Sequence, residues 1–354
     1  MTSMANFADS PARFRIRGDL GGIPKYLPGK SSPDAIKLSS NEVAHTPLPG
    51  VAEAMAKATA QANRYPDIVN VELRKKLAEH LGLDWEQVAV GVGSSALCQQ
   101  LVQISAGPGD EVIYPWRSFE AYPIFVQVTG ATAVPVPLTP SGHNDLDAMA
   151  DAITDRTKLI FVCNPNNPTG TTVSKAAFER FLERVPKDVI IALDEAYTEY
   201  LRVEDTPHAP ELLRDHPNLI GLRTFSKAYG LAGVRVGYAF GDEEIIDALN
   251  RVALPFGVNV AAQAGAIASL EANEELLERT EEVARNRDIV SERLGLPRSQ
   301  ANFVWIDTDQ GEAIAEQLLA HGVIVRAFPE GVRITVTSDE ETQRLLEAWE
   351  QVQI

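Results

Sequence analysis

The sequence predicts an α/β fold in which a large domain holds a mostly parallel seven-stranded sheet and a smaller α+β domain follows it. Short apolar runs alternate with helical segments between residues 87 and 240, and such alternation favours a parallel sheet with helices on both faces. The pattern changes after Leu254, where a long charged helix precedes shorter elements. A chain of 354 residues is also long enough for two hydrophobic cores.

Seven apolar runs are predicted to form the strands of the large sheet. They lie at 87–91, 111–114, 133–138, 158–163, 189–193, 219–223 and 234–240. Apolar residues recur at helical spacing over 69–81, directly before Gly82, and a second helix is expected at 175–185. A third helix, at 96–104, follows the small residues Gly93-Ser94-Ser95.

The two ends of the chain differ in texture from this central part. The stretch through Pro33 is rich in Pro and Gly without periodicity, which predicts an arm that lies across another surface. The C-terminal part is predicted to hold helices at 274–294, 312–321 and 339–352 and strands at 302–306, 323–326 and 332–336. We therefore expect an arm and part of the small domain at 1–36, the large domain at 37–254, and the small domain at 255–354.

The composition excludes several classes of partner. The net charge is -17 with an isoelectric point near 4.8, so nucleic acid, which needs a basic surface, is not expected. No run of about 18 apolar residues suggests a membrane span, and the start lacks the apolar core of a signal peptide. The protein is expected to be cytoplasmic. Cys98 and Cys163 lack zinc-type spacing, which predicts buried reduced thiols and no metal site.

The segment 224–235 contains a lysine, Lys227, between two strand-like runs. A lysine can form a Schiff base when an apolar pocket or nearby cations disfavour its ammonium form. Arg235 adds a forked cation able to hold a phosphate. The small residues of the segment leave room for a planar cofactor: Ser226, Ala228, Gly230 and Gly233. Alone, the segment also fits a solvated loop lysine.

A second motif, Gly93-Ser94-Ser95, places backbone N–H groups and two hydroxyls at a helix start, where the helix dipole favours an anion such as phosphate. The same residues also suit a plain helix cap. A third alternative is a dinucleotide site, because residues 91–96 match its glycine fingerprint loosely. That site needs an acidic residue at the far end of the next strand, and Asp110 and Glu111 fall at its start, so it is disfavoured.

Two more motifs follow predicted strands directly. Residues 164–170, Asn-Pro-Asn-Asn-Pro-Thr-Gly, place the amide of Asn167 at the carboxyl edge of the sheet, where open α/β sheets bind ligands. The strand at 189–193 ends in Asp194, with Tyr197 three residues later. A carboxylate at that edge suits a protonated ring nitrogen. Taken singly, each motif also fits a turn or a solvated strand end.

Together the four motifs resemble the fold-type I pyridoxal-phosphate enzymes, and within them the histidinol-phosphate aminotransferase-like branch of the class II aminotransferases. The resemblance runs from Lys37-Leu38-Ser39-Ser40-Asn41-Glu42 to Gly331-Val332-Arg333-Ile334-Thr335-Val336 and implies pyridoxal 5'-phosphate as the cofactor. Lys227 is similar to the lysine that forms the Schiff base and then moves the substrate proton. Asp194 matches the residue that keeps the pyridine nitrogen protonated.

The resemblance implies roles for further residues around the cofactor. Asn167 and Tyr197 match the pair that hydrogen-bonds the ring hydroxyl, and Tyr197 joins Lys227 and Asp194 as a catalytic residue. Phe119 falls where the family stacks an aromatic side chain on the ring. The phosphate cradle corresponds to Gly93, Ser94, Ser95, Thr224, Ser226 and Arg235.

Two further matches concern the substrate and the assembly. Arg333 is similar to the arginine that clamps the α-carboxylate of the substrate through a bidentate fork. Tyr65, in Arg64-Tyr65-Pro66-Asp67, matches a tyrosine that reaches the cofactor phosphate of a neighbouring subunit, which implies a homodimer. Without the resemblance, Arg333 fits a surface salt bridge and Tyr65 an exposed turn.

The substrate class rests on smaller signals. The segments 41–47 and 116–122 are more similar to the aromatic amino acid, or phenylalanine, aminotransferases than to the histidinol-phosphate enzymes. This implies amino transfer between an aromatic amino acid and 2-oxoglutarate, with Tyr26 as a lid contact. The alternatives are histidinol phosphate, whose phosphate would need a cation such as Arg326, and a decarboxylase on the same scaffold.

Overall fold

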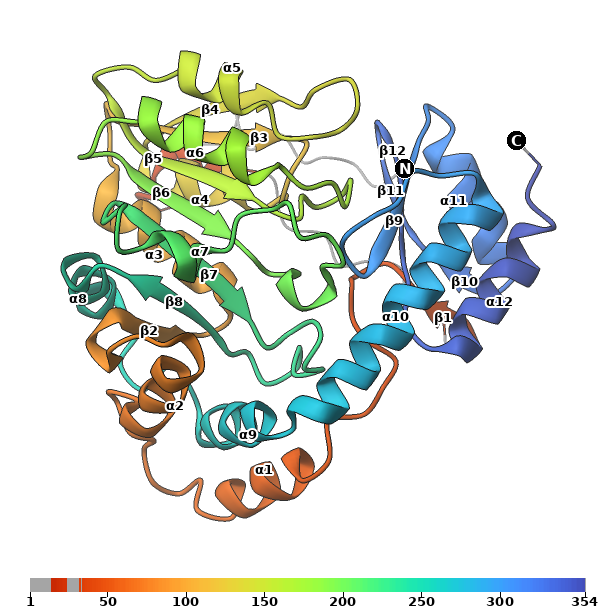
Figure 1. The fold of residues 1–354 in the computed structure, drawn as a ribbon, viewed down its shortest axis with the longest axis horizontal. Coiled ribbons are helices and arrows are strands. Elements are labelled where there is room, and N and C mark those ends of the chain that lie inside the picture. The colour runs from red at the N-terminus through yellow and green to blue at the C-terminus, as the bar shows by residue number, and fades with distance from the viewer. Residues whose placement is uncertain (1–13, 24–31, 33, 354) are drawn as a thin grey trace.

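A computed structural model gives the fold of residues 14–23, 32 and 34–353. Its largest element is a seven-stranded sheet, which crosses the left half of Figure 1, while two smaller sheets and their helices form the blue lobe on the right. The cavity described below lies where these two parts meet. Among the described residues, no helix is both long and apolar enough to cross a membrane.

The large sheet has the strand order β2-β8-β7-β6-β5-β3-β4. Six of its strands run parallel to one another, and β8 is antiparallel to both β2 and β7. The strands are β2 (Val88–Gly91), β3 (Glu111–Trp116), β4 (Thr132–Pro137), β5 (Thr157–Cys163), β6 (Ile190–Asp194), β7 (Leu219–Thr224) and β8 (Gly237–Gly241). The predicted mostly parallel seven-stranded sheet is confirmed.

Helices cover both faces of this sheet and create two separate cores. One core contains α3 (Ser94–Ser105), α4 (Tyr122–Thr129) and α8 (Glu243–Val252). The other contains α1 (Val51–Thr59), α2 (Val71–Leu81), α5 (Leu146–Asp151), α6 (Lys175–Arg184), α7 (Ala209–Leu212) and α9 (Val260–Glu271). Because side chains alternate along a strand, Phe161 of β5 faces the first core and its neighbour Val162 the second. This double burial explains why the strands are apolar without interruption.

The smaller lobe is built around its own core of aliphatic residues. Its antiparallel sheet has the order β11-β12-β9, and β1 pairs with β10 in a two-stranded parallel sheet. The strands are β1 (Ile36–Lys37), β9 (Phe303–Asp307), β10 (Val323–Ile324), β11 (Arg326–Phe328) and β12 (Gly331–Thr335). The helices are α10 (Asn273–Leu294), α11 (Gly311–Ala320) and α12 (Asp339–Trp349). The long α10 runs from the end of α9 into this lobe (Figure 1).

Two predicted segments differ from the structure. The run 234–240 was expected to be strand throughout, but β8 begins at Gly237, because Arg235 adopts a left-handed backbone with φ 61° and carries the turn. The predicted strand at 323–326 is divided between β10 and β11, which pair in different sheets. Both differences concern a cavity residue, because Arg235 lies in the turn before β8 and Arg326 begins β11.

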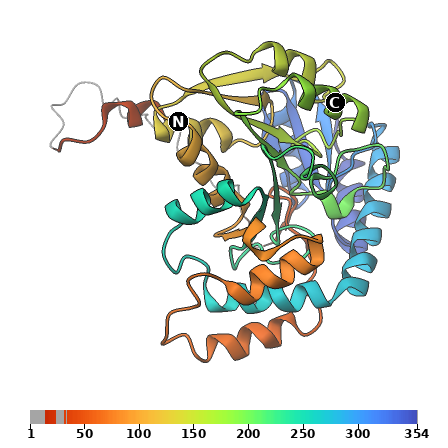
Figure 2. The same cartoon turned by 60° about the vertical axis from the view of Figure 1, so that its left-hand side comes forward.

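The helix α9 has no counterpart among the sequence predictions. Its sequence, VAAQAGAIASLE, is small and apolar on all sides and lacks the periodicity that marks an amphipathic helix. Figure 2 shows α1, α9 and α2 side by side at one end of the molecule. At Gly265 an added Cβ would lie 3.0 Å from Met55, so this glycine allows α9 to approach α1 closely. The domain boundaries at residues 36 and 254 stay predictions.

Of the predicted arm, only residues 14–23 and 32 are described. A short 3₁₀ helix, Gly18–Gly22, has no buried residue. Arg17 donates to the carbonyl of Val128 at the end of α4, at 3.0 Å. The described part of the arm therefore contacts the large lobe through α4.

Candidate active site

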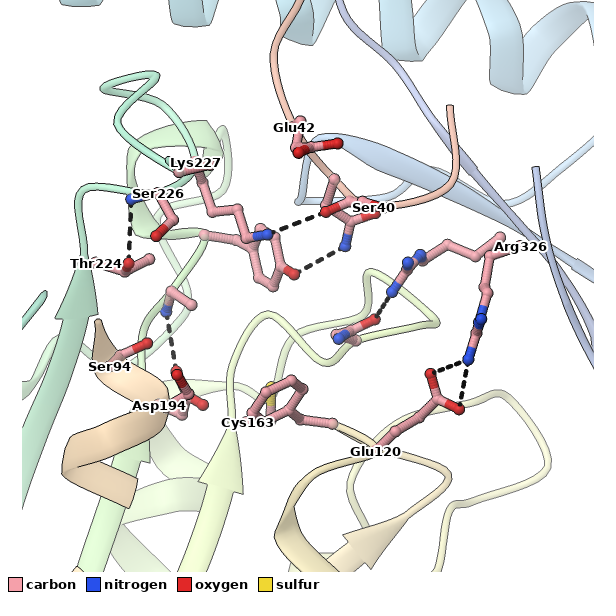
Figure 3. A pocket seen from close by; sticks show the side chains of 18 of the residues that line it. Ser40, Glu42, Ser94, Glu120, Cys163, Asp194, Thr224, Ser226, Lys227 and Arg326 are labelled. Carbon is pink, nitrogen blue, oxygen red and sulfur yellow. Dashed lines mark hydrogen bonds and ion pairs between the residues drawn. The ribbon is translucent and has the colours of Figure 1, made fainter. Parts of the chain in front are cut away.

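A cavity of about 410 Å³ lies between the carboxyl edge of the large sheet and the small lobe. Figure 3 shows the amine of Lys227 reaching into it, with Asp194 below and the pair Arg326–Glu120 at one end. Most of the predicted site residues line this cavity: Ser94, Ser95, Phe119, Asn167, Asp194, Tyr197, Thr224, Ser226, Lys227, Arg235, Arg326 and Arg333.

Strand register brings the predicted motifs to the same edge of the sheet. Cys163, the last residue of β5, pairs with Asp194, the last residue of β6. Gly237 at the start of the antiparallel β8 pairs with Gly91 of β2 on one side and with Thr224 of β7 on the other. The segments that follow β2, β5, β6 and β7 therefore enter one space, although they are far apart in the sequence.

Lys227 follows β7 and points into the middle of the cavity. Its Nζ donates to the carbonyl oxygen of Ser40 at 3.2 Å. Burial lowers the pKa of Lys227 to about 8, and the positive charge of Arg333 acts in the same direction. The lowered pKa makes the neutral amine more accessible near neutral pH than it is in a solvated lysine, as a nucleophilic lysine requires.

Asp194 is 4% exposed at the end of β6. One carboxylate oxygen accepts a hydrogen bond from the Tyr122 hydroxyl at 2.6 Å, and the other accepts from the N–H of Ala196 at 3.2 Å. Burial raises the pKa of Asp194, and the Tyr122 hydrogen bond opposes that shift. A cationic N–H group in the cavity would stabilise the charged form of this carboxylate, which is the chemistry expected of a protonated pyridine ring.

The start of α3 and the turn after β7 form one end of the cavity. Arg235 donates to Ser226 Oγ at 3.2 Å and to Ser95 Oγ at 3.4 Å, and the Ser226 N–H donates to Thr224 Oγ1 at 3.1 Å. A guanidinium, hydroxyls and a helix N-terminus are the donors that a phosphate monoester needs. The donor set therefore fits the phosphate of the expected cofactor.

Two glycines allow this end of the cavity to form. A Cβ on Gly93 would lie 2.3 Å from Arg235 Nη2, and Gly93 has a φ of +79° that L side chains rarely adopt. A Cβ on Gly237 would lie 2.4 Å from the backbone nitrogen of Ser94. Gly93 does not line the cavity, but it allows Arg235 to lie against the start of α3.

Asn167 is held by a contact from β12, and Tyr197 by a contact from the segment that follows β1. Arg333 donates to Asn167 Oδ1 at 2.6 Å and to the carbonyl of Ser39 at 2.7 Å. Asn41 Nδ2 donates to Tyr197 Oη at 2.8 Å, and Asn41 also bonds Thr335. Because the Tyr197 oxygen accepts from Asn41, its own proton is directed elsewhere. Arg333 and Thr335 lie two residues apart on β12, so one strand orients both side chains.

The opposite end of the cavity holds Arg326 and Glu120, and Phe119, which precedes Glu120 in the chain, also lines the cavity. Arg326 Nη2 lies 3.2 and 3.1 Å from the two oxygens of Glu120. Phe119 makes edge contacts with Tyr122 and Phe125, at ring-centroid distances of 5.4 and 6.4 Å. These contacts hold the Phe119 ring on the cavity wall, where it can pack against a flat ligand.

Tyr65 lies away from the cavity of this chain. Tyr65 is 81% exposed and stacks on Phe256 with ring centroids 4.5 Å apart, beside a separate groove between α1 and α9. Tyr26, predicted as a lid contact, lies outside the described residues. The roles assigned to both stay predictions.

Sequence reasoning missed several residues of the site. Lys37 ends β1, and Ser40, Asn41 and Glu42 lie in the segment that leads from β1 to α1; all four line the cavity. The Asn41-Glu42 pair was a signal, because a left-handed residue is often Asn, and Asn41 has a φ of 55°. Tyr122 and Glu120 gave none beyond their closeness to Phe119. Among the described residues, no group of three His, Cys, Asp or Glu side chains suits a metal ion.

Comparisons with known proteins agree with this geometry. Residues 33–348 match the family model for class I and II aminotransferases. An aromatic amino acid aminotransferase of Corynebacterium diphtheriae is 66% identical over 339 residues, which cover 95% of this chain and 98% of the relative. Another of the same name, from Corynebacterium glutamicum (strain ATCC 13032), is 60% identical over 95% of this chain and 99% of its own length.

Solved structures of aminotransferases also superpose on this chain. The histidinol-phosphate aminotransferase of Sinorhizobium meliloti, in complex with pyridoxal-5'-phosphate, superposes with a TM-score of 0.87 at 28% identity, over 96% of this chain and 97% of that one. A double mutant of Thermus thermophilus aspartate aminotransferase gives 0.78 at 30% identity, over 89% and 91%. This chain therefore belongs to the class I and II aminotransferase family, and its cofactor is pyridoxal 5'-phosphate.

Proposed function

We propose that the protein moves the amino group between an aromatic amino acid and 2-oxoglutarate. The substrate class rests on one observation: relatives that are 50–66% identical over nearly the whole chain are named aromatic amino acid aminotransferases. The geometry supports amino transfer, because Lys227, Asp194 and Arg333 line one cavity. In this proposal the two substrates use the cavity in turn.

The chain's own residues have distinct tasks in this proposal. Bound pyridoxal phosphate supplies an electron-withdrawing ring that takes up the electron pair left when the substrate Cα–H bond breaks. Asp194 holds the proton on the ring nitrogen. Lys227, with its lowered pKa, accepts the proton from Cα of the amino donor. In the second half-reaction it returns a proton to Cα of the new amino acid. Arg333 binds the substrate α-carboxylate and fixes its orientation.

Other residues hold the cofactor in place. Ser94, Ser95, Thr224, Ser226 and Arg235 bind its phosphate, as the donor set at the start of α3 suggests. Phe119 packs against the ring face. Asn167 and Tyr197 bind the ring oxygen. Arg333 donates to Oδ1 of Asn167 and Asn41 donates to the Tyr197 oxygen, which leaves the amide N–H of Asn167 and the hydroxyl proton of Tyr197 to be donated into the cavity.

The second candidate is histidinol phosphate, which the similarity to the Sinorhizobium meliloti enzyme favours. Its phosphate would need an available cation at the end of the cavity away from Arg235. Arg326 is the predicted cation, but the two Glu120 oxygens lie 3.1 and 3.2 Å from it. This ion pair leaves Arg326 less able to bind a phosphate, and an aromatic side chain therefore remains the better candidate.

The experiment compares kcat/KM for phenylalanine, tyrosine, tryptophan and histidinol phosphate, with 2-oxoglutarate as the acceptor. We expect kcat/KM for at least one aromatic substrate to exceed that for histidinol phosphate. The aromatic proposal is wrong if histidinol phosphate has the highest value. Turnover of the amino acid without any keto acid would instead indicate the decarboxylase alternative.

We further propose a homodimer in which Tyr65 enters the partner's site. Arg235 and Tyr65 are both exposed in the single chain, and apolar side chains are exposed around Tyr65, including Ile68, Leu254 and Phe256. A second copy would cover these surfaces and complete the phosphate end of the cavity. A cytoplasmic location is proposed as well, and the free thiols of Cys98 and Cys163 agree with a reducing compartment.

Mixing a Lys227→Ala variant with a Tyr65→Ala variant tests the shared site. A heterodimer of Lys227→Ala and Tyr65→Ala chains contains one site with both native residues if Tyr65 acts on the partner. Random reassociation should then restore about a quarter of the wild-type activity. If Tyr65 acts within its own chain, no activity returns. Sedimentation of the wild-type protein should show twice the monomer mass of 38.5 kDa.

A further inference from the structure

The ion pair between Arg326 and Glu120 has no task in the mechanism above. Arg326 begins β11 in the small lobe, and Glu120 precedes α4 in the large lobe. Their side chains are 25% and 30% exposed, so the pair is partly shielded from water. Figure 3 places it on the far side of Lys227 from Ser94, Thr224 and Ser226. The pair therefore lies at the end of the cavity away from the phosphate donors.

The charge at the Arg326 end of the cavity depends on Glu120. With both residues ionised, the pair is neutral as a whole, and its Coulomb attraction is stronger than at a fully solvated surface. A substrate with an anionic side chain must take Arg326 from Glu120 and also meets the repulsion of the displaced carboxylate. A substrate with an uncharged ring meets neither cost.

We propose that Glu120 is a specificity-determining residue, the counter-charge that makes this end of the cavity suit an uncharged aromatic side chain and penalises a phosphate-bearing one. The inference rests on the proposed function, since it assumes that substrate side chains extend toward Arg326. A monoanionic side chain, such as that of 2-oxoglutarate, remains acceptable because one carboxylate can replace another on Arg326. A phosphate dianion is penalised more, because its repulsion by Glu120 is greater.

A neighbouring ion pair supplies a matched control. Arg117 binds Glu330 through two hydrogen bonds of 2.9 and 2.8 Å. The guanidiniums of Arg117 and Arg326 lie 5.5 and 5.6 Å from the same Phe328 ring. Arg117 and Glu330, however, do not belong to the residues that line the cavity. Loss of the Glu330 charge should therefore change the surface near Phe328 without changing the charge that a substrate meets.

The test uses Glu120→Gln and Glu330→Gln holoenzymes with phenylalanine, glutamate and histidinol phosphate as amino donors. For Glu120→Gln, we expect kcat/KM for histidinol phosphate relative to phenylalanine to rise about tenfold or more over wild type, equivalent to about 1.4 kcal/mol. The rise should appear mainly in KM, and glutamate should show a smaller rise. Glu330→Gln should leave both ratios at the wild-type value.

Further variants separate specificity from structure. Glu120→Asp keeps the charge and should keep the wild-type ratio, whereas adding Arg326→Gln to Glu120→Gln should abolish the gain. The proposal is overturned if Glu120→Gln lowers kcat/KM for all three substrates in proportion, as the loss of a purely structural residue would. It is also overturned if the kcat/KM ratios stay unchanged. A wild-type enzyme that prefers histidinol phosphate would refute the proposed function alone, because the change of ratio in the variant would still report on Glu120.

Discussion

Two arginines at opposite ends of the cavity differ in the groups that surround them. Arg235, at the cofactor end, donates to the hydroxyls of Ser95 and Ser226 and to a backbone carbonyl. Within the described part of the chain, no carboxylate forms an ion pair with it. Arg326, at the substrate end, contacts both oxygens of Glu120. One cation is surrounded by neutral acceptors and the other by an opposite charge.

The difference shows how one cavity can treat two anionic ligands differently. A cation among hydroxyls keeps its full attraction for a phosphate, which therefore remains bound. A cation beside a carboxylate attracts an anion only in exchange for that carboxylate. The first arrangement suits a resident cofactor. The second suits a site that must accept an uncharged ring and a carboxylate in alternate half-reactions.

The largest effect is expected from a substitution at the centre of the cavity, between its two ends. Lys227→Ala should reduce turnover about 10³-fold or more, since the residue that we propose moves the proton is removed. The cofactor's visible absorbance should also lose the band of the lysine-bound form. Lys37→Ala, which removes another lysine from the cavity wall, should retain that band. A Lys227→Ala enzyme with wild-type absorbance would refute the assignment.

Substitution of Arg235 or Arg326, the arginines at the two ends of the cavity, tests the contrast directly. Arg235→Gln should weaken binding of pyridoxal phosphate roughly 10- to 100-fold, because hydrogen bonds to a charged group contribute about 1.5–3 kcal/mol. Arg326→Gln should leave cofactor affinity within about threefold of wild type. Equilibrium titration of both apoenzymes with the cofactor measures the difference. Equal losses in the two variants would break the distinction between the ends.

The pH dependence of cofactor attachment sharpens the role of the cofactor end. In the proposed role of Lys227 only its neutral amine bonds to the cofactor, and the pKa of this amine is lowered from 10.5 to about 8. The attachment rate should therefore rise with pH and level off above about 8, falling about tenfold per unit at lower pH. Arg235→Gln should move the midpoint upward, since the positive charge of Arg235 contributes to the lowered pKa. Stopped-flow absorbance follows the reaction, and a midpoint near 10 would contradict the burial of this amine.

The smallest expected effect concerns the link between the two lobes. Asn41→Gly keeps the left-handed backbone at φ 55° but removes the amide that donates to Tyr197. We expect kcat to fall about 3- to 10-fold, since a net hydrogen bond contributes about 0.5–1.5 kcal/mol. Cofactor affinity should change less than in Arg235→Gln. An unchanged kcat would show that Tyr197 needs no donor from this segment.

Much of the architecture could be predicted because it depends on local patterns. The strands β5 and β6 are short apolar runs bounded by turn residues, and the polar residues after them had to meet at one edge of a parallel sheet. Helix α9 could not be found in the same way, since a helix buried on several sides has no polar face to give it a period. The separation of β10 from β11 was also hidden, because it depends on which partner each strand finds.

The sequence by itself determined the motifs, and with them Lys227, Asp194, Asn167 and the family resemblance. The tertiary structure alone decided which groups face one another across the cavity. Glu120 meets Arg326 from a position 206 residues away, and Asn41 meets Tyr197 across 156 residues. The physical reason is that local propensity is fixed by neighbours in the chain, whereas the charge and hydrogen bonding of a site depend on side chains that only the packing of two lobes brings together.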